Sequence, residues 1–320
     1  MAASSGPVEM RQAFGDALVE LGGERDDVLV LDADLDTSTR TSIFRDAFPD
    51  RFIQVGIAEQ NLMGIAAGLA LEGFIPLPST FASFATRRAL DQIALSICYP
   101  KLNVKIPGSY VGLPTSRAGA SHTCIEDIAV MRALPHMRVA DPGDNAELRA
   151  VIRAAVESPG PVYFRVTRTT LSDIFPVGHV FEWGRGHVIR PGGEVTLIGT
   201  GMMTDRCQGA AELLAADGIE AEVVHMGSIK PLDADLVVES VNRTGCAVTA
   251  ENATTAGGLG AAVTEVLSER APAPVERIGV RDQFVESGHV DELFEHHRMR
   301  PADIAAAARR AMDTRDAGRG

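Results

Sequence analysis

The sequence predicts an α/β protein of two domains, each a doubly wound, mainly parallel sheet with helices on both faces. Short apolar runs alternate with longer runs of helical period, which is typical of βαβ units. The alternation breaks once, where glycines and prolines gather at residues 176–193. The 320 residues suffice for two domains of roughly 150 residues each. We therefore expect a first domain at 8–175, a linker at 176–190 and a second domain at 191–313.

The first domain begins with a helical pattern at residues 9–21, which Gly22 and Gly23 are expected to end. After it, short apolar runs predict strands, and apolar residues spaced i, i+3, i+4 and i+7 predict helices. The strands are expected at 28–31, 74–77, 104–106, 139–140 and 162–166, and the helices at 58–71, 82–97 and 145–156.

The second domain repeats this alternation after the glycine- and proline-rich break. Its strands are expected at 195–198, 221–224, 247–249 and 275–280, and its helices at 203–216, 233–241, 258–268, 290–296 and 301–312.

The composition argues against several classes of protein. A net charge of −13 disfavours nucleic-acid binding, because a phosphate backbone is held by clustered Lys and Arg. The four cysteines lie far apart without a CxxC pair, so a zinc site or redox dithiol is not expected. The N-terminus lacks the features of a signal peptide and no apolar run could span a bilayer, so we expect a cytoplasmic protein.

A carboxylate opens the helix that is expected after the segment FIQVGIAEQN. Glu59 falls in the first turn of this helix, where the helix dipole favours a negative charge. On position alone, a capping glutamate is the more common interpretation, so the segment by itself is weak evidence for a site.

A pair of phenylalanines follows in the segment STFASFATRRALDQI. Phe81 and Phe84 are spaced i, i+3, so both are expected on one face of a helix. Two neighbouring rings in a chain with few aromatics could form a wall for a heteroaromatic ring. Ordinary core packing is the common alternative for such a pair.

Together, GIAEQN and STFASFATRRALDQI resemble the pyrimidine-binding domain of transketolases. The likeness extends through most of the chain and also includes segments that resemble the C-terminal domain of the family. MRQAFGDALVELG at 10–22 resembles the family's entry helix and DADLDTST at 32–39 its aspartate- and serine-bearing loop. IKPLD at 229–233 and GGLG at 257–260 resemble segments of its C-terminal domain.

The resemblance implies thiamine diphosphate as the cofactor. It implies that Glu59 hydrogen-bonds the pyrimidine ring nitrogen, that Phe84 stacks on this ring and that Phe81 lies beside it. The expected reaction is the transfer of a two-carbon ketol unit from a ketose to an aldehyde, with the cofactor as electron sink.

Substrate residues can be carried over from the family in the same way. Arg11, Ser38 and Arg168 match positions that hold the substrate phosphate, and a guanidinium is well shaped for that anion. His122 matches a catalytic histidine near the hydroxyl groups of the donor. On sequence position alone, a solvated arginine or a structural histidine would be the more common role.

The segment GSYVGLPTSRAGASH departs from the family pattern. Tyr110 stands where the family usually has a histidine, and Arg117 and Ala118 replace a Glu-Asp pair. Losing the aspartate removes a hydrogen-bond acceptor worth about 1–3 kcal/mol when buried. We therefore hypothesise a non-standard donor or acceptor that contacts Tyr110 and Arg117, such as an anionic or carrier-tethered aldehyde.

The GDG motif, with which thiamine enzymes bind Mg²⁺ and the diphosphate, is absent from the sequence. The Gly143–Asp144–Asn145 segment is expected to open a helix instead. Because the diphosphate needs a divalent ion and the ion needs oxygen ligands, we expect the magnesium ligands on a separate N-terminal subunit and none on this chain. The expected assembly is an α2β2 heterotetramer that is active only as a complex.

Other functions remain open at this stage. The nearest alternative is the β-subunit of a 2-oxo acid dehydrogenase E1 component, and deoxyxylulose-phosphate synthase is a related one. A non-catalytic scaffold subunit is a third. His289, His296 and His297 are interpreted as a solvated surface without a metal.

Overall fold

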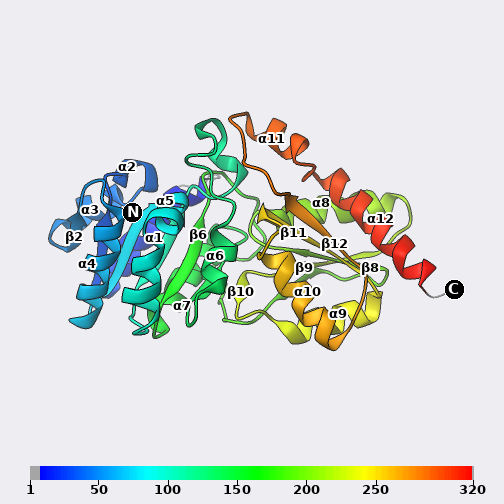
Figure 1. The fold of residues 1–320 in the computed structure, drawn as a ribbon, viewed down its shortest axis with the longest axis horizontal. Helices are drawn as coiled ribbons and strands as arrows, with labels where there is room; N and C mark the ends of the chain where they lie inside the picture. The colour runs from blue at the N-terminus through cyan, green and yellow to red at the C-terminus, as the bar shows by residue number, and fades with distance from the viewer. Residues whose placement is uncertain (1–7, 319–320) are drawn as a thin grey trace.

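The computed structural model describes residues 8–318, which form two α/β domains lying side by side (Figure 1). Each domain holds one sheet covered on both faces by helices, so the predicted fold class is confirmed. The site described below lies on the first domain, and part of the second domain packs beside it.

The first sheet has seven strands in the order β10-β5-β6-β4-β3-β1-β2. All neighbours are parallel except the edge pair of β10 with β5. The central strands are buried along their whole length, as expected for a parallel sheet that is covered on both faces. The strands are β1 (Val28–Asp32), β2 (Phe52–Gln54), β3 (Ile75–Phe81), β4 (Lys105–Ser109), β5 (Arg138–Ala140), β6 (Val162–Val166) and β10 (Ser228–Lys230).

Two groups of helices cover this sheet. One apolar cluster packs α1, α3 and α7 on one face, and another packs α4, η2 and α6 on the other. The elements are α1 (Met10–Glu24), α2 (Asp36–Thr39), α3 (Ser42–Ala47), η1 (Pro49–Arg51), α4 (Glu59–Leu71), α5 (Ala82–Arg88), the π-helix η2 (Gln92–Cys98), the 3-10 segment η3 (Leu113–Ala118), α6 (Asp127–Ala133) and α7 (Asn145–Glu157).

Two helix predictions need correction. The first helix continues through Gly22 and Gly23 to Glu24. Gly22 is there because it packs against aromatic rings: a Cβ added to it would lie 2.7 Å from Phe44 and from Phe48. The helix expected over 82–97 is two elements, since α5 ends at Arg88 and η2 begins at Gln92.

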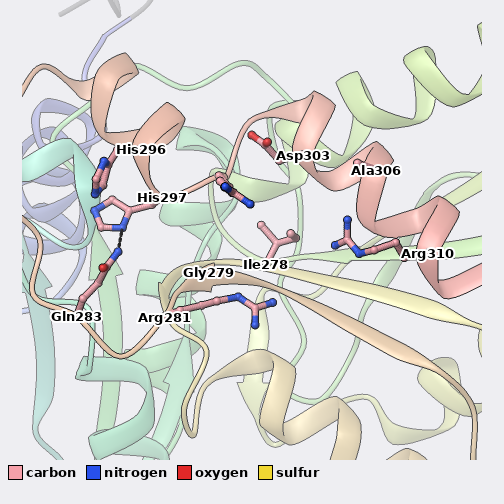
Figure 2. Close-up of a pocket in the computed structure, with 10 residues that line it drawn as sticks. Ile278, Gly279, Arg281, Gln283, His296, His297, Asp303, Ala306 and Arg310 are labelled. Atoms are coloured by element: carbon pink, nitrogen blue, oxygen red, sulfur yellow. Dashed lines mark hydrogen bonds between the residues drawn. The ribbon is translucent and has the colours of Figure 1, made fainter.

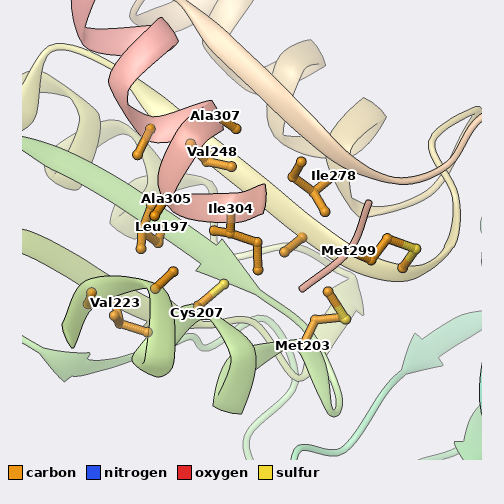
Figure 3. Close-up of a cluster of buried hydrophobic side chains, with 14 of the residues drawn as sticks. Leu197, Met203, Cys207, Val223, Val248, Ile278, Met299, Ile304, Ala305 and Ala307 are labelled. Atoms are coloured by element: carbon orange, nitrogen blue, oxygen red, sulfur yellow. The ribbon is translucent and has the colours of Figure 1, made fainter. Parts of the chain in front are cut away.

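The second sheet has the order β12-β11-β8-β9-β7, and only β7 is antiparallel to its neighbour. Helices α8 and α12 pack on one face, in the core shown in Figure 3, and α9 and α10 on the other. The elements are β7 (His187–Arg190), β8 (Val195–Gly199), α8 (Met203–Ala216), β9 (Ala221–His225), α9 (Ala234–Thr244), β11 (Ala247–Thr254), α10 (Leu259–Arg270), β12 (Val275–Val280), α11 (Val290–His296) and α12 (Pro301–Ala317).

The connection between the domains differs from the expected linker at 176–190. Its last residues form β7, which pairs with β9 in the second sheet. The chain then returns, because β10 follows β9 in sequence and pairs with β5 of the first sheet. Both strands are short and lie in glycine- or proline-rich sequence, so the apolar pattern does not reveal them.

Candidate active site

The predicted site residues gather at the carboxyl edge of the first sheet. Ser38 follows β1, Glu59 follows β2 and Phe81 ends β3, while Tyr110 follows β4 and Arg168 follows β6. The carboxyl ends of parallel strands meet at one edge, which is where open α/β sheets bind ligands. The strand order therefore brings together residues that are far apart in the sequence.

Glu59 is a buried carboxylate at the start of α4, with only 5% of its side chain exposed. Its Oε1 accepts a hydrogen bond of 2.9 Å from Nη1 of Arg88. The guanidinium of Arg88 also lies 4.1 Å from the ring centroid of Phe84. Among the described residues, Glu59 thus has a single charged partner, and the side chain of that partner is half exposed.

Three aromatic rings lie in a row beside this carboxylate. The rings of Phe81 and Phe84 are stacked at 5.6 Å, and those of Phe81 and Tyr110 at 4.1 Å. The expected pairing of the two phenylalanines is present, but the expected reason is wrong. Phe81 is the last residue of β3 and has an extended backbone, so the two rings do not share a helix face.

His122 approaches the edges of these rings. Its imidazole lies 5.9 Å from the Phe81 centroid and 5.4 Å from that of Phe84, both in an edge-on geometry. Its Nδ1 lies 2.8 Å from Oγ of Ser121. The half-buried ring is therefore oriented by a neighbour and placed next to both phenylalanines.

Two arginines surround Tyr110 at the other end of the row. Nη1 of Arg11 donates to the Tyr110 hydroxyl at 2.9 Å and to the backbone carbonyl of Ser38 at 3.2 Å. The guanidinium of Arg168 lies 5.2 Å from the centre of the Tyr110 ring. Arg168 is exposed and has no ion pair among residues 8–318, so its charge is available to an anion.

Arg117 does not join this group. It lies in η3, exposed to solvent, and its Nη2 is 3.3 Å from Nε2 of His289 in the second domain. None of its contacts in the described part of the chain reaches the other predicted site residues. The neighbouring Ala118 is also exposed.

Sequence reasoning missed two residues that organise the site. Arg88 carried a usable signal, because it lies i+4 from Phe84 on the same helix. Asp32 is fully buried and accepts hydrogen bonds from the Leu35 amide and from the hydroxyls of Thr39 and Thr41. Burial raises the pKa of Asp32 to about 6. This carboxyl group fixes both ends of the short helix α2, which carries Ser38.

The chain matches two family models, one for each domain. Residues 6–173 match the transketolase pyrimidine-binding domain, and residues 184–304 match the transketolase C-terminal domain. The two matches follow each other in the order that the resemblance implies.

Relatives of similar length support the same assignment. The chain is 42% identical over 299 residues to the 6-deoxy-6-sulfo-D-fructose transketolase subunit SqwH of Clostridium sp. (strain MSTE9), covering 93% of both proteins. It is 41% identical to a putative transketolase C-terminal section of Methanocaldococcus jannaschii, covering 92% of this chain and 94% of that one. A solved structure described as "split gene transketolase, inactive beta4 tetramer" superposes with a TM-score of 0.91 at 50% identity, over 96% of this chain and 99% of that one.

The fold and these matches define a transferase subunit with two α/β domains. The chain belongs to the transketolase family and has the two domains of a transketolase C-terminal section. The predicted family, its two-domain α/β fold and the role of a transketolase-type subunit that works within a complex are confirmed. Membership of this family implies dependence on thiamine diphosphate.

The site residues suit the pyrimidine end of that cofactor. A planar group with N–H donors already lies between Glu59 and Phe84, since the Arg88 guanidinium donates to the carboxylate and lies over the ring. An aminopyrimidine has the same planarity and the same donors. An open cleft of about 580 Å³ adjoins these residues and is lined by Ile57, Ala58, Glu59, Gln60, Asn61, Arg87 and Arg88.

Proposed function

We propose that this chain forms the pyrimidine-binding half of a two-subunit transketolase. The complex transfers a two-carbon ketol unit from a ketose to an aldehyde, with an N-terminal subunit as the partner and α2β2 as the assembly. The observation that carries the proposal is the buried Glu59 carboxylate at the wall of an open cleft, joined through Arg88 to the stacked rings of Phe84 and Phe81.

In this proposal the cofactor, once bound, supplies the electron sink for cleaving a carbon–carbon bond. Glu59 would accept a hydrogen bond from the pyrimidine nitrogen, in the place where it now accepts one from Arg88, and would hold or release the proton there. Phe84 would stack on the ring, with Phe81 beside it. His122 lies at the ring edges, where it can hydrogen-bond hydroxyl groups of the substrate.

The diphosphate end needs a divalent ion with oxygen ligands, which we assign to the partner subunit. Asp144, the acidic residue in the segment nearest to GDG, supports this assignment because its carboxylate is already used. It caps α7 by accepting from the amide of Glu147, and it also accepts from the amides of Ile174 and Phe175. We therefore propose Mg²⁺ that is held without ligands from this chain.

The surface next to the cleft suits a partner. Large apolar side chains are exposed there or on the same layer of helices: Ile57 at 77%, Leu71 at 70%, Leu95 at 62% and Tyr99 at 82%. Two exposed glycines on α4, Gly64 and Gly68, have no described atom within 4 Å of an added Cβ. A patch of this kind is typical of a protein–protein interface.

For the substrate, we propose a ketose or an aldehyde with an anionic end. Arg11 and Arg168 flank the Tyr110 hydroxyl and ring, and guanidinium groups recognise phosphate or sulfonate oxygens. The name of the Clostridium relative gives a sulfonated sugar as its substrate. Arg117 contacts His289 instead, so we propose a role for it only with a large or carrier-tethered substrate.

The test is Glu59→Gln in the complex reconstituted with the N-terminal subunit, thiamine diphosphate and Mg²⁺. We expect ketol transfer to fall by about 10²-fold or more, because general acid–base catalysis contributes 10²–10⁴-fold. Unchanged activity would favour a scaffold role. Decarboxylation of a 2-oxo acid without ketol transfer would favour the dehydrogenase alternative.

Among residues 8–318, no helix is both long enough and apolar enough to cross a membrane. We propose that the subunit acts in the cytoplasm, because its four cysteines are scattered along the sequence without a CxxC pair.

A further inference from the structure

Two adjacent histidines and a glutamate converge where α11 ends. His296 is the last residue of α11, His297 is its C-cap and Glu286 lies in the preceding loop. Nε2 of His296 is 3.2 Å from Oε1 of Glu286, and Nε2 of His297 is 3.3 Å from Oε2 of the same carboxylate. The two imidazole rings are nearly perpendicular, at 86°.

His297 has a buried nitrogen that the protein does not satisfy. Its side chain is 1% exposed, and Nε2 finds no hydrogen-bond partner among the described residues despite the nearby carboxylate. A buried, unsatisfied ring nitrogen that faces a carboxylate and a second imidazole is the chemistry of a metal ligand.

We propose that Glu286, His296 and His297 bind a divalent transition-metal ion such as Zn²⁺. Zinc binds histidine nitrogen and carboxylate oxygen at about 2.0–2.2 Å, so neighbouring ligand atoms in a tetrahedron lie about 3.3–3.5 Å apart. Each imidazole Nε2 lies at about this spacing from a different oxygen of Glu286, 3.2 Å for His296 and 3.3 Å for His297. The three ligand atoms all lie within 4.8 Å of one another.

A neighbouring amide orients the buried imidazole. The side-chain nitrogen Nε2 of Gln283 lies 2.9 Å from Nδ1 of His297. Figure 2 shows the two side chains facing each other. A half-turn of this amide presents its oxygen to Nδ1–H and leaves the lone pair of Nε2 for the metal. Metal-ligating histidines usually have such a partner on their second nitrogen.

Three protein ligands leave one position of the ion open. His296 and His297 also line a cavity of about 630 Å³, together with Arg281, Arg298 and Arg310, and this cavity gives solvent access to the two rings. The site is therefore of the open kind, in which solvent completes the coordination, rather than the closed kind with four protein ligands.

The ion would also connect to the loop at the active site. The loop that holds Glu286 continues to Gly288, whose carbonyl accepts from Ser116 Oγ at 2.7 Å. Thr115, next to Ser116, donates to the carbonyl of Tyr110 at 2.7 Å. Metal binding at Glu286 would thus restrict the motion of residues 286–288, which connect to Tyr110 through Ser116 and Thr115.

The test is calorimetric titration of the full chain with Zn²⁺ after dialysis against a chelator. We expect one ion per chain and a higher melting temperature with zinc, since a ligand that binds only the folded state stabilises it. Glu286→Gln and His296→Gln alter exposed side chains and should each weaken binding by at least about 100-fold, and Gln283→Leu by about 10-fold. His136→Gln, which changes an exposed histidine elsewhere, is the matched control.

Absence of saturable binding, or equal binding by Glu286→Gln, His296→Gln and the control, would overturn the proposal. The four buried cysteines could also bind zinc in a partly unfolded chain. Titration with Co²⁺ separates the two cases, because thiolate ligands give charge-transfer absorption that nitrogen and oxygen ligands do not. A thiolate spectrum would also overturn it.

Discussion

At the scale of single residues, the candidate site divides into a proposed cofactor end and a proposed anion end, which share the ring of Phe81. Glu59, Arg88 and Phe84 form the first, while Arg11 and Tyr110 belong to the second. The stacked rings between them keep the two ends at a fixed spacing. A substitution at one end of the site should therefore leave the side-chain contacts at the other end largely unchanged.

Arg168→Ala tests the anion end. The exposed guanidinium has no competing ion pair in residues 8–318, so its removal should raise KM for an anionic substrate by about 10-fold and leave kcat nearly unchanged. Steady-state kinetics of the reconstituted complex measures both constants. Arg149→Ala, which removes a surface arginine paired with Glu20, is the control. An equal fall in kcat would place Arg168 in the chemical step instead.

Glu251 offers a test of pH dependence. Its carboxyl group is fully buried and accepts from the amides of Leu259 and Gly260, yet burial raises its pKa to about 7. Since the folded pKa lies above the unfolded value, the contribution of this group to stability is fully present below about pH 4.5 and is lost as pH rises through about 7.

Glu251→Gln cannot titrate, so the stability of the native chain relative to this variant should fall by about 1–3 kcal/mol between pH 5 and pH 8. Urea unfolding of both proteins at several pH values measures the difference. If the difference in unfolding free energy between the two proteins stays constant from pH 5 to pH 8, Glu251 does not titrate in this range.

Much of the site could be predicted because the resemblance fixes which residue types occur at which positions. Glu59, Phe81, Phe84, His122, Tyr110, Arg11 and Arg168 do form one contact network. Arg117 could not be placed in this way, because its position depends on how η3 packs on the second domain. The proposed metal site could not be predicted for the same reason. Its carboxylate, Glu286, comes from the loop before α11 rather than from the helix that bears His296.

At the scale of elements, long apolar patterns predicted the positions of helices and strands well, whereas the glycines near the end of α1 did not predict where that helix ends. The strands β6 and β12 and the helices α8 and α11 have the expected bounds. The end of α1 was wrong because Gly22 serves packing rather than termination. Tertiary contact overrides local propensity here, and one sequence alone does not show it.

Two glycines of α1 provide a matched pair. A Cβ added to Gly15 would lie 2.6 Å from the carbonyl oxygen of Arg40, whereas one added to Gly23 meets no described atom within 4 Å. Gly23→Ala should stabilise the chain by about 0.5–1 kcal/mol through helix propensity. Gly15→Ala should destabilise it by about 1–3 kcal/mol through overpacking.

Thermal or urea unfolding of the two alanine variants measures both effects. Stabilisation by Gly15→Ala would show that α1 and the segment after α2 pack less closely than described.

At the scale of the whole molecule, the two domains are joined by more than a linker. Strand β10 crosses back to the first sheet, and the buried Arg165 of β6 bonds Asp127 and Asp141 as well as the carbonyl of Asn252 in β11. Losing one partner of a buried ion-pair network strongly destabilises a protein. These contacts of Arg165 therefore hold the two domains in one arrangement. In the proposed function, this rigid unit supplies one half of the active site and the partner subunit supplies the other.

The most direct test is a titration of this chain with the N-terminal subunit at fixed thiamine diphosphate and Mg²⁺, with ketol transfer as the readout. The proposal predicts negligible turnover by this chain alone and activity that saturates at one N-terminal subunit per chain. Substantial cofactor-dependent turnover by this chain without the second subunit would contradict it.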